Sequence, residues 1–355
     1  MNDIRITMNE TLKSKPDAAN LGFGKYFTDH MFIMDYTDGK GWHDPVIMPY
    51  SPLSLDPSTM VFHYGQSVFE GLKAFKTADG RILLFRPRDN MVRLNVSDDR
   101  LCIPFIDPDF GVEAIKALVS LERGWIPDQR GTSLYIRPFT IATDPFIGVK
   151  PSETYKFIII LSPVGNYYPQ GINPVKIFVE DKYVRAVKGG LGFTKAAANY
   201  AASLKSQEEA HAAGYVQVLW LDGVERKYIE EVGTMNVFFK IKNQIITPAL
   251  EGSILPGITR SSAIDILKDS GYDVVERRLG IDEVFKANEE GQLEEAFGTG
   301  TAAVISPIGE LSWKSNKIII NNGKIGDISK KIYDTITSIQ YGEVYDKFNW
   351  TVEVK

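Results

Sequence analysis

At 355 residues, of which 44% are hydrophobic and 24% charged, the chain is long enough for about two globular domains. Its net charge of −5 at pH 7 gives no support for a nucleic-acid or anionic-membrane partner. Its one cysteine, Cys102, excludes an intramolecular disulfide and a cysteine-based zinc site, and its four histidines lack the spacing of a metal motif, so we expect no metal.

The N-terminal segment has the pattern of neither a signal peptide nor a transit peptide. Residues 1–22 lack an apolar core and carry acidic side chains. No uninterrupted apolar run approaches the length that spans a membrane. We therefore expect a protein of a reducing compartment, most simply the cytoplasm, with no membrane partner.

The first half of the chain mixes predicted strands and helices. Runs rich in aliphatic and β-branched residues predict the strands, and apolar positions at helical spacing predict the helices. One helix follows Pro87, because proline is favoured in a first turn. The predicted strands cover residues 31–36, 81–85, 133–142 and 155–161, and the predicted helices cover about 87–101 and 112–121.

The second half begins after a segment rich in proline, glycine and asparagine, residues 163–174, which predicts a linker between two domains. Strands and helices then follow one another without regular alternation, which favours an α+β fold over a doubly wound sheet. The predicted strands cover residues 175–180, 216–222, 236–242 and 273–278, and the predicted helices cover about 258–269 and 281–288.

The candidate reactive residue lies in GGLGFTKAAANY, residues 189–200. Here Lys195 stands where a glycine-rich loop is predicted to become an alanine-rich helix that ends at Gly214. The dipole of a helix N-terminus and burial both disfavour the ammonium form, which suits a lysine that forms a Schiff base with a carbonyl cofactor. Most lysines are solvated surface groups, so this residue alone leaves that alternative open.

Two further stretches have features of a site for a phosphate-bearing cofactor. A carboxylate of EEVGTMN, residues 230–236, can keep a ring nitrogen protonated, although an acidic residue there is more often a turn group. In LPGITR, Pro256 and Gly257 leave the N–H groups of Ile258 and Thr259 able to hold a phosphate at a helix N-terminus. Plain capping of a helix is the alternative for this second stretch.

Three other stretches are ambiguous on their own. FGTGTAAV carries Gly298, Gly300 and Ala303 at the spacing of a relaxed dinucleotide fingerprint, but the Val-Ile-Ser-Pro run that follows cannot open a helix. Its small and hydroxyl residues still allow close approach to an anion. The aromatic residues of HYGQSVFEGLKAF are typical of core packing, and Arg137 in an apolar strand needs an anionic partner from the protein or a ligand.

Together these stretches resemble the branched-chain amino acid aminotransferases, a group within the class IV pyridoxal-phosphate-dependent aminotransferases. The resemblance covers about residues 23–311 and rests on GKGWHDP, VFHYGQSVFEGLKAF, LFRPRDNM, YIRPF, KGGLGFTKAAANYAASL, VQVLWLDG, EEVGTMNVFF, ILPGITR and FGTGTA in this order. It implies an α+β, two-domain enzyme of fold type IV that forms a homodimer. It also implies a smaller N-terminal α/β domain (1–163), an interdomain linker (164–176) and a larger C-terminal cofactor-binding domain (177–355).

The activity that the resemblance implies is reversible transfer of the amino group of leucine, isoleucine or valine to 2-oxoglutarate, with pyridoxal 5'-phosphate as the cofactor. A D-amino acid aminotransferase or an aminodeoxychorismate lyase of the same fold is an alternative, although the EVGTMN and YIRP motifs favour the branched-chain group. A dinucleotide-dependent dehydrogenase is a remote alternative from another class. A non-catalytic binding protein is disfavoured, because every reactive position is present.

The resemblance also assigns roles to single residues. Lys195 matches the lysine that forms the Schiff base and moves a proton at the substrate Cα, and Arg137 matches a group that contacts the distal carboxylate of glutamate. Ala303 and Ser306 stand where some members carry Cys-x-x-Cys, so a thiol switch of that type is not expected. The implied cofactor-binding residues are Arg86, Lys195, Tyr200, Glu231, Ile258, Thr259 and Thr301. The implied substrate-binding residues are Phe23, Tyr64, Phe69, Tyr135, Arg137, Thr234, Thr301 and Ala302.

Overall fold

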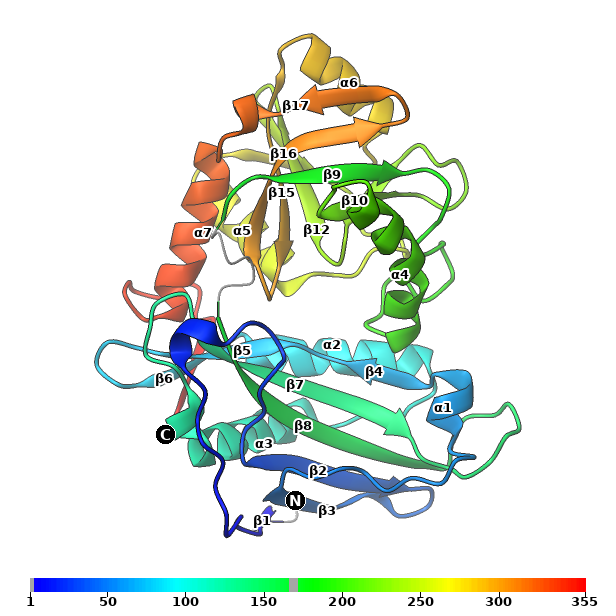
Figure 1. Ribbon diagram of the computed structural model, residues 1–355, viewed down its shortest axis with the longest axis vertical. Coiled ribbons are helices and arrows are strands. Elements are labelled where there is room, and N and C mark those ends of the chain that lie inside the picture. The colour runs from blue at the N-terminus through cyan, green and yellow to red at the C-terminus, as the bar shows by residue number, and fades with distance from the viewer. Residues whose placement is uncertain (1–2, 166–171) are drawn as a thin grey trace. The chain divides into compact units, whose positions relative to one another are not determined.

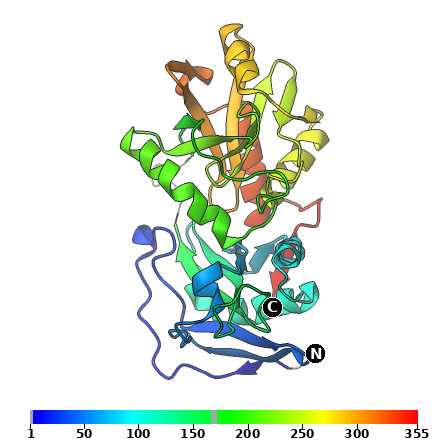
Figure 2. The ribbon, with the colours of Figure 1, turned by 90° about the vertical axis from the view of Figure 1, so that its right-hand side faces the viewer.

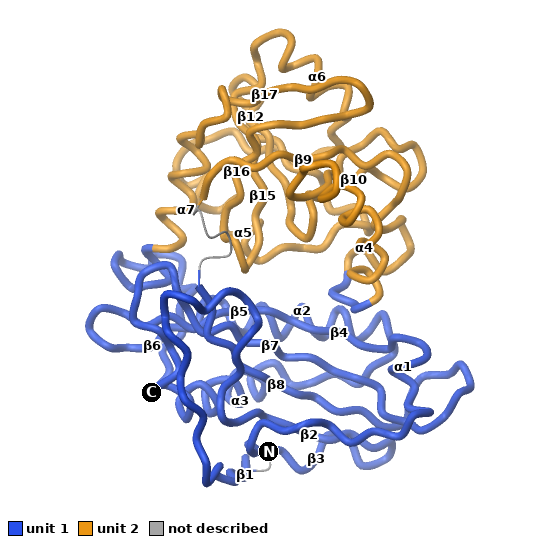
Figure 3. Tube along the Cα trace, in the orientation of Figure 1, with its two compact units in different colours: residues 1–169, 194–197, 338–355 blue, residues 170–193, 198–337 orange. Residues whose placement is uncertain are grey.

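The structure is a computed structural model that describes residues 3–165 and 172–355. The chain divides into two compact units (Figure 3), of which unit 1 contains residues 1–169, 194–197 and 338–355, and unit 2 contains residues 170–193 and 198–337. Within the described residues each unit is built on one nine-stranded sheet and carries helices, so the expected α+β fold with two domains is confirmed. Part of the predicted linker, 164–176, lies outside the described residues.

The sheet of unit 1 has the strand order β1-β3-β2-β8-β7-β5-β6-β18, and β4 pairs with β7. The central pair β7 and β8 is antiparallel and almost entirely buried, because its strands are aliphatic on both faces. The bounds are β1 Arg5–Ile6, β2 His30–Thr37, β3 Gly41–Pro49, β4 Ser67–Phe69, β5 Leu72–Lys76, β6 Ile82–Phe85, β7 Ser133–Ala142, β8 Thr154–Val164 and β18 Thr351–Val354.

The two long helices of unit 1 pack on its sheet, as Figures 1 and 2 show. Helix α2 follows a left-handed Arg86 with proline in its first turn, and the Asp107 side chain caps α3 by accepting N–H bonds from residues 109 and 110. Apolar residues of both helices, among them Leu94 and Ile115, join the buried core with strand residues such as Leu84. The bounds are α1 Met60–Tyr64, α2 Pro87–Arg100, α3 Pro108–Leu121, and the 3₁₀ turns Ala18–Asn20 and Arg123–Trp125.

The end of the chain returns to unit 1. Strand β18 pairs antiparallel with β6, with Thr351 opposite Phe85, and so forms an edge of the first sheet. Unit 1 therefore holds more residues than unit 2, whereas the sequence predicted a smaller N-terminal domain and placed all residues after 177 in one C-terminal domain. The predicted domain boundaries stay a prediction, and the pairing of β18 with β6 is the physical reason for this difference.

The sheet of unit 2 has the order β11-β10-β9-β16-β15-β12-β13-β14, and β17 pairs with β16. Its pairing is mixed, because β9 runs parallel to both of its neighbours while most other pairs are antiparallel. The strands are β9 Val175–Glu180, β10 Gln217–Leu221, β11 Ile229–Val232, β12 Asn236–Ile241, β13 Gln244–Thr247, β14 Asp273–Glu276, β15 Leu293–Gly300, β16 Val304–Trp313 and β17 Asn316–Ile319. The helices are α4 Ala197–Ala212, α5 Ile258–Asp269, α6 Ile281–Glu289, α7 Asp327–Gln340, which ends in unit 1, and the 3₁₀ turn Asn321–Gly323.

Most predicted elements are confirmed to within a few residues. Strands β7 and β9 and helix α5 have the predicted bounds, and α3 begins four residues earlier than predicted because Pro108 opens it. The alanine-rich helix is α4, and Gly214 follows it with a left-handed φ of 86°. No helix among residues 3–165 and 172–355 is long and apolar enough to cross a membrane.

Candidate functional site

Lys195 lies in a short segment of unit 1, residues 194–197, whose main chain is held on both sides. Its N–H donates to Ser97 Oγ at 2.9 Å, and its carbonyl accepts from the N–H of Phe69 at 3.1 Å. Ala196 forms a β-bridge with Val68, and α4 begins at the next residue. The prediction that Lys195 stands where a loop becomes a helix is therefore confirmed, and hydrogen bonds from α2 and β4 fix its position.

An aromatic cluster surrounds the predicted cations of unit 1. Lys195 Nζ lies 5.1 Å from the centre of the Phe69 ring, and the guanidinium carbon of Arg137 lies 4.5 Å from the same centre. Arg137 Nη2 donates to the Tyr135 hydroxyl at 3.1 Å, and Tyr135 packs edge-on against Phe23 with centroids 4.9 Å apart. The structure thus brings together five residues that the sequence predicted separately.

Tyr135 can occupy its position in this cluster because Gly71, which faces its hydroxyl group, has no side chain. A Cβ at Gly71 would lie 2.0 Å from the Tyr135 hydroxyl oxygen, so only glycine admits the ring in this position. Gly71 is the glycine of the FEGLKAF motif, directly before β5. The motif therefore combines aromatic packing with a close approach of backbone to the cluster, which the core-packing alternative alone did not predict.

Arg137 makes no ion pair with a described residue, so the fixed ion pair that was the alternative for it is not found there. Among residues 3–165 and 172–355, no carboxylate oxygen lies within 4.0 Å of its guanidinium nitrogens. Its Nε is buried and has no hydrogen-bond partner in the described part of the chain, and its remaining contacts are the ring faces of Phe69 and Tyr135. A half-buried guanidinium with an unused N–H favours a ligand anion as its partner.

Two predicted residues of unit 1 make other contacts. Tyr64 ends α1 with a side chain that is 40% exposed, and its hydroxyl donates to the carbonyl of Ile147. The guanidinium of Arg86 lies over the Trp350 ring at 5.4 Å, and its Nε donates to Asp89 at 2.5 Å. The structure does not place these two residues in the aromatic cluster, and their predicted roles stay predictions.

Sequence reasoning missed a group of buried charges in the same unit. Glu70 accepts two hydrogen bonds from Arg93, at 2.7 and 2.8 Å, in a pair that is almost fully buried. Both carboxyl oxygens of Asp98 are buried without a partner among the described residues, and burial and the nearby Glu70 raise the pKa of Asp98 well above its usual value. Burial lowers the pKa of Lys73, opposite Tyr135 across β5 and β7, to about 8. The sequence did carry a signal for these buried charges, because Arg93 and Asp98 lie among the apolar positions of the predicted helix.

In unit 2, Glu231 lies on the buried strand β11, where it is 3% exposed. Its Oε1 accepts from the N–H of Leu255 at 2.8 Å and lies 3.2 Å from Arg185 Nη2. Arg185 also donates to the carbonyls of Gly192 and Ser253. A guanidinium beside a buried carboxylate stabilises its ionised form. Sequence reasoning missed Arg185, because its motif, KYVRAV, has no periodic pattern that marks it as buried.

The N-terminus of α5 is open to an anion. Its N-cap is Gly257, and no side chain in the described part of the chain caps the first turn, so no such cap uses the N–H groups of Ile258 and Thr259. A Cβ at Gly257 would lie 1.9 Å from Asn236 Oδ1, and the Asn236 amide donates to the carbonyl of Leu255 at 2.9 Å. Asn236 therefore holds the LPG turn in the shape that exposes these amides. It is a second residue that sequence reasoning missed.

The glycine-rich FGTGTA stretch is a hairpin. Residues 301–303 connect β15 to β16, which pair antiparallel, with Gly300 opposite Val304. A dinucleotide fingerprint requires a strand that leads into a helix, so the structure contradicts the dehydrogenase alternative. The half-buried Thr301 and Ala302 lie at this turn, and Thr234 lies exposed in the turn between β11 and β12.

The remaining predicted residue, Tyr200, lies in the first turn of α4 and is half-buried. Its carbonyl accepts a hydrogen bond from Ser203 Oγ at 2.7 Å, while Asn199 donates to the carbonyl of Leu191 at 2.9 Å. Within unit 2 these bonds tie the start of α4 to the glycine-rich loop that precedes Lys195. The predicted role of Tyr200 stays a prediction.

Comparison with known proteins gives consistent matches. The family model "Amino-transferase class IV" matches residues 67–311. "Branched-chain-amino-acid aminotransferase 2" of Bacillus subtilis (strain 168) is 62% identical over 351 residues, which are 99% of this chain and 97% of that protein. The crystal structure of the Escherichia coli branched-chain amino acid aminotransferase has a TM-score of 0.77 at 27% identity, with 92% of this chain and 99% of that chain covered. The branched-chain amino acid aminotransferase of Thermobaculum terrenum in its PLP form has a TM-score of 0.73 at 25% identity, with 91% and 98% covered.

Proposed function

Because this chain belongs to the class IV aminotransferases, we propose that it is a branched-chain amino acid aminotransferase, which reversibly transfers the amino group of leucine, isoleucine or valine to 2-oxoglutarate. The observation that carries this proposal is the single ring of Phe69 that Lys195 and Arg137 share, at 5.1 and 4.5 Å. The reactive amine of Lys195 and the guanidinium of Arg137, which can bind a substrate carboxylate, therefore lie against the same apolar ring. The names of relatives at 46–62% identity support the branched-chain group over the other members of the fold.

Pyridoxal 5'-phosphate fits the residues that the chain offers. The open first turn of α5, held by Gly257 and Asn236, suits a phosphate, and a buried carboxylate at Glu231 suits a protonated ring nitrogen. Lys195 supplies the amine that a carbonyl cofactor requires. When bound, this cofactor supplies an electron sink for negative charge that develops at the substrate Cα.

Proton transfer and cofactor binding are assigned to different groups of the chain. We assign Lys195 to moving the proton at the substrate Cα, because its main chain is fixed on both sides and the Nζ can move only through its own side chain. Arg185 and the N–H of Leu255 orient the Glu231 carboxylate. The amides of Ile258 and Thr259 bind the phosphate through the backbone.

The aromatic cluster explains how one surface accepts two kinds of side chain. Phe69, Tyr135 and Phe23 offer apolar surface to a branched side chain, worth about 1.5–3 kcal/mol when the side chain is fully buried. A carboxylate is expelled from such a surface unless a cation meets it. The guanidinium of Arg137 supplies that cation for glutamate and 2-oxoglutarate, and its Nε–H has no hydrogen-bond partner among the described residues.

A single-turnover assay on the purified, cofactor-loaded protein tests this function. The visible absorbance of the bound cofactor is followed after mixing with leucine, isoleucine, valine, L-glutamate or D-alanine. We expect rapid conversion with the first four amino acids and none with D-alanine. Conversion with D-alanine alone would assign the chain to another member of the fold, and a protein that binds no cofactor would end the proposal.

We also propose that the enzyme is a homodimer. Exposed apolar side chains gather on α1 and the loop after β7, where Phe62, Ile147 and Val149 are 62%, 67% and 87% exposed. A surface of this kind is common at contacts between protein chains. Light scattering on the eluting protein should give twice the chain's 39.7 kDa, and Ile147→Asp should lower the mass toward one chain. A wild-type protein that elutes as one chain would contradict the proposal.

We place the enzyme in the cytoplasm. Cys102, the single cysteine of the chain, is exposed and free in the structure, as expected for a protein that does not depend on an oxidising compartment. Fractionation of cells that produce the full chain should recover the activity with cytoplasmic marker enzymes. Recovery in an extracellular or membrane fraction would contradict this placement.

A further inference from the structure

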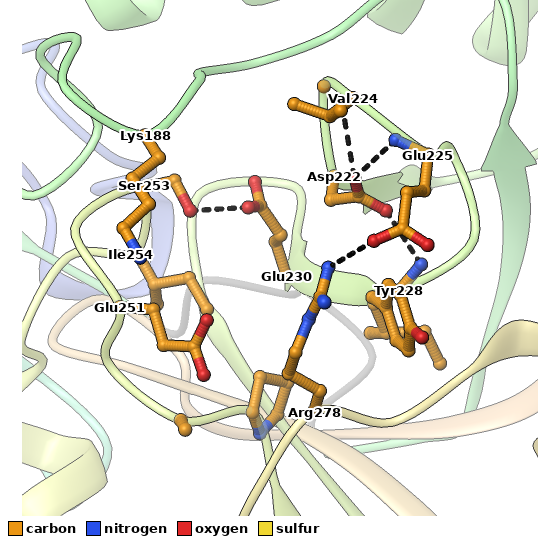
Figure 4. A pocket seen from close by; sticks show the side chains of 14 residues that line it. Lys188, Asp222, Val224, Glu225, Tyr228, Glu230, Glu251, Ser253, Ile254 and Arg278 are labelled. Atoms are coloured by element: carbon orange, nitrogen blue, oxygen red, sulfur yellow. Dashed lines mark hydrogen bonds and ion pairs between the residues drawn. The ribbon is translucent and has the colours of Figure 1, made fainter.

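Unit 2 contains a pocket on the side of β11 that carries Glu230, the neighbour of Glu231. Its volume is about 220 Å³. The turn 222–228, strand β11 and the segment 248–254 line it, as Figure 4 shows. The exposed side chains of Lys188, Glu225, Glu251 and Arg278 surround its mouth. None of the predicted cofactor or substrate residues lines this pocket.

Three of the charged groups around the pocket already have protein partners. The Asp222 carboxylate accepts four backbone N–H bonds, from residues 224, 225, 227 and 228, and so stiffens the turn. Arg278 donates to Glu225 at 3.0 Å and lies 3.6 Å over the Tyr228 ring (Figure 4). These groups form the rigid wall of the pocket and offer little to a ligand.

Glu230 is different, because one of its carboxyl oxygens is unused. The residue is 6% exposed, and its Oε1 accepts from Ser253 Oγ. Its Oε2 is buried and has no hydrogen-bond partner among the described residues. In Figure 4 the carboxyl group lies between Ser253 and the 222–228 turn, with its second oxygen turned away from Ser253. Burial raises the pKa of this carboxyl group, which a cation beside it would reverse.

The rest of the inner wall is apolar. Ile229 and Ile254 are buried, and Pro248 and Ala249 complete the surface beside the Glu230 carboxyl group. The lining contains four acidic and two basic side chains, which makes the pocket net negative and favours a cation over an anion. Alkyl surface next to an unused carboxylate oxygen is the environment that an organic ammonium ion requires, since bare metal ions prefer several oxygen ligands.

We propose that this pocket is a second ligand site, separate from the predicted catalytic residues, which binds a small alkylammonium ion through an N–H bond to Glu230 Oε2. The alkyl part lies against Ile254 and Pro248. The ligand needs both a positive charge and an N–H donor, and a neutral molecule of the same shape lacks the recognition. The source of the ammonium group, a simple amine or the α-amino group of an amino acid, is decided by the probes below.

The first experiment uses ligand-observed NMR and calorimetry on the cofactor-loaded protein with three probes of one shape. Piperidinium carries charge and N–H and forms no stable imine with the cofactor, N,N-dimethylpiperidinium carries charge alone, and tetrahydropyran carries neither. We expect saturable binding of piperidinium only, with an unchanged visible absorbance. Proline, a cyclic secondary ammonium with a carboxylate, should bind more tightly than piperidinium if the natural ligand is an amino acid and more weakly if it is an amine. Equal binding of tetrahydropyran, or no binding of piperidinium, would overturn the proposal.

Variants then test the assigned contact. Glu230→Gln should weaken piperidinium binding by about 10–100-fold, because a charge-assisted hydrogen bond is lost. The matched control Glu251→Gln removes an exposed acid at the mouth and should change the dissociation constant less than about threefold. Ala249→Phe fills the pocket while leaving the Glu230 side chain in place and should abolish binding. Unchanged binding in folded Glu230→Gln or Ala249→Phe protein would place the probe elsewhere and refute the assignment.

Discussion

The two units differ in the kind of group that they offer to a ligand. Unit 1 offers side chains, namely an amine and a guanidinium over one phenylalanine ring. Unit 2 offers mainly backbone, namely the uncapped first turn of α5, together with one carboxylate that Arg185 holds. A side chain can be removed by substitution, whereas a backbone amide can only be displaced. The difference therefore predicts distinct failures, with lost chemistry or selectivity in unit 1 and lost cofactor in unit 2.

The largest effect is expected for Lys195→Ala in unit 1. This substitution removes both the amine nucleophile and the base at the substrate Cα, so turnover of leucine should fall by at least about 10²–10⁴-fold. The cofactor should remain bound. The amount bound is measured by the fluorescence of the pyridoxal 5'-phosphate that denaturation of the protein releases. Lys205→Ala, an exposed lysine of α4, serves as the control. A Lys195→Ala enzyme with near-normal turnover would remove the basis of the comparison.

Arg137→Met should separate the two substrates. Loss of the guanidinium should slow the glutamate half-reaction about 10–100-fold relative to the leucine half-reaction, since charge-assisted bonds are worth about 1.5–3 kcal/mol. Single-turnover rates for the two amino acids measure this ratio. Arg137→Lys keeps the charge and should restore part of the glutamate rate. Equal losses on both substrates would assign Arg137 to structure, despite its unused Nε.

Gly257→Ala should weaken binding of the cofactor by unit 2. The new Cβ would meet Asn236 Oδ1 at 1.9 Å, so the LPG turn must shift and the amides of α5 with it. We expect the dissociation constant of the cofactor to rise by roughly tenfold, which corresponds to about 1.4 kcal/mol, while single-turnover rates at saturating cofactor change little. Gly280 caps α6 in the same way, but a Cβ there has no neighbour closer than 3.9 Å. Gly280→Ala should therefore bind the cofactor normally, and a loss there equal to that of Gly257→Ala would reject the steric argument.

The smallest effect concerns stability, through Asp98 in unit 1. Its carboxyl pKa is raised in the folded protein, so the folded chain holds a proton that the unfolded chain releases above pH 3.8. Stability is thus lost as pH rises from about 3.8 toward the raised value. Asp98→Asn imitates the protonated acid, so it should match wild type at acid pH and exceed it by about 1 kcal/mol at pH 7.

Calorimetric melting temperatures at the two pH values measure this difference. The matched control is Asp99→Asn, the exposed neighbour on α2, which should show no such dependence. A variant at Asp98 that is less stable than wild type at pH 7 would mean that its carboxylate has a favourable partner when ionised.

The same contrast explains what could be predicted from the sequence. Lys195, Arg137 and most helix starts carry their signal in residue type and spacing, and the structure has Lys195 just before α4 and Arg137 on β7, while their roles stay predictions. Arg185 and Asn236 act through folded neighbours 46 and 19–21 residues away, namely Glu231 and the LPG turn, and no local pattern encodes such pairs. The dinucleotide alternative arose because glycine spacing alone does not distinguish a hairpin from a strand that enters a helix.

The pairing of β18 with β6 has a consequence for synthesis on the ribosome. Strand β6 ends at Phe85, but its edge partner, residues 351–354, is made much later. At 5–20 residues per second, β6 remains an unpaired edge for on the order of 15–50 s while the remaining chain is made. An open strand edge is a template for pairing with other chains. The pairing of residues 351–354 therefore removes a site at which the nascent sheet could pair with other chains.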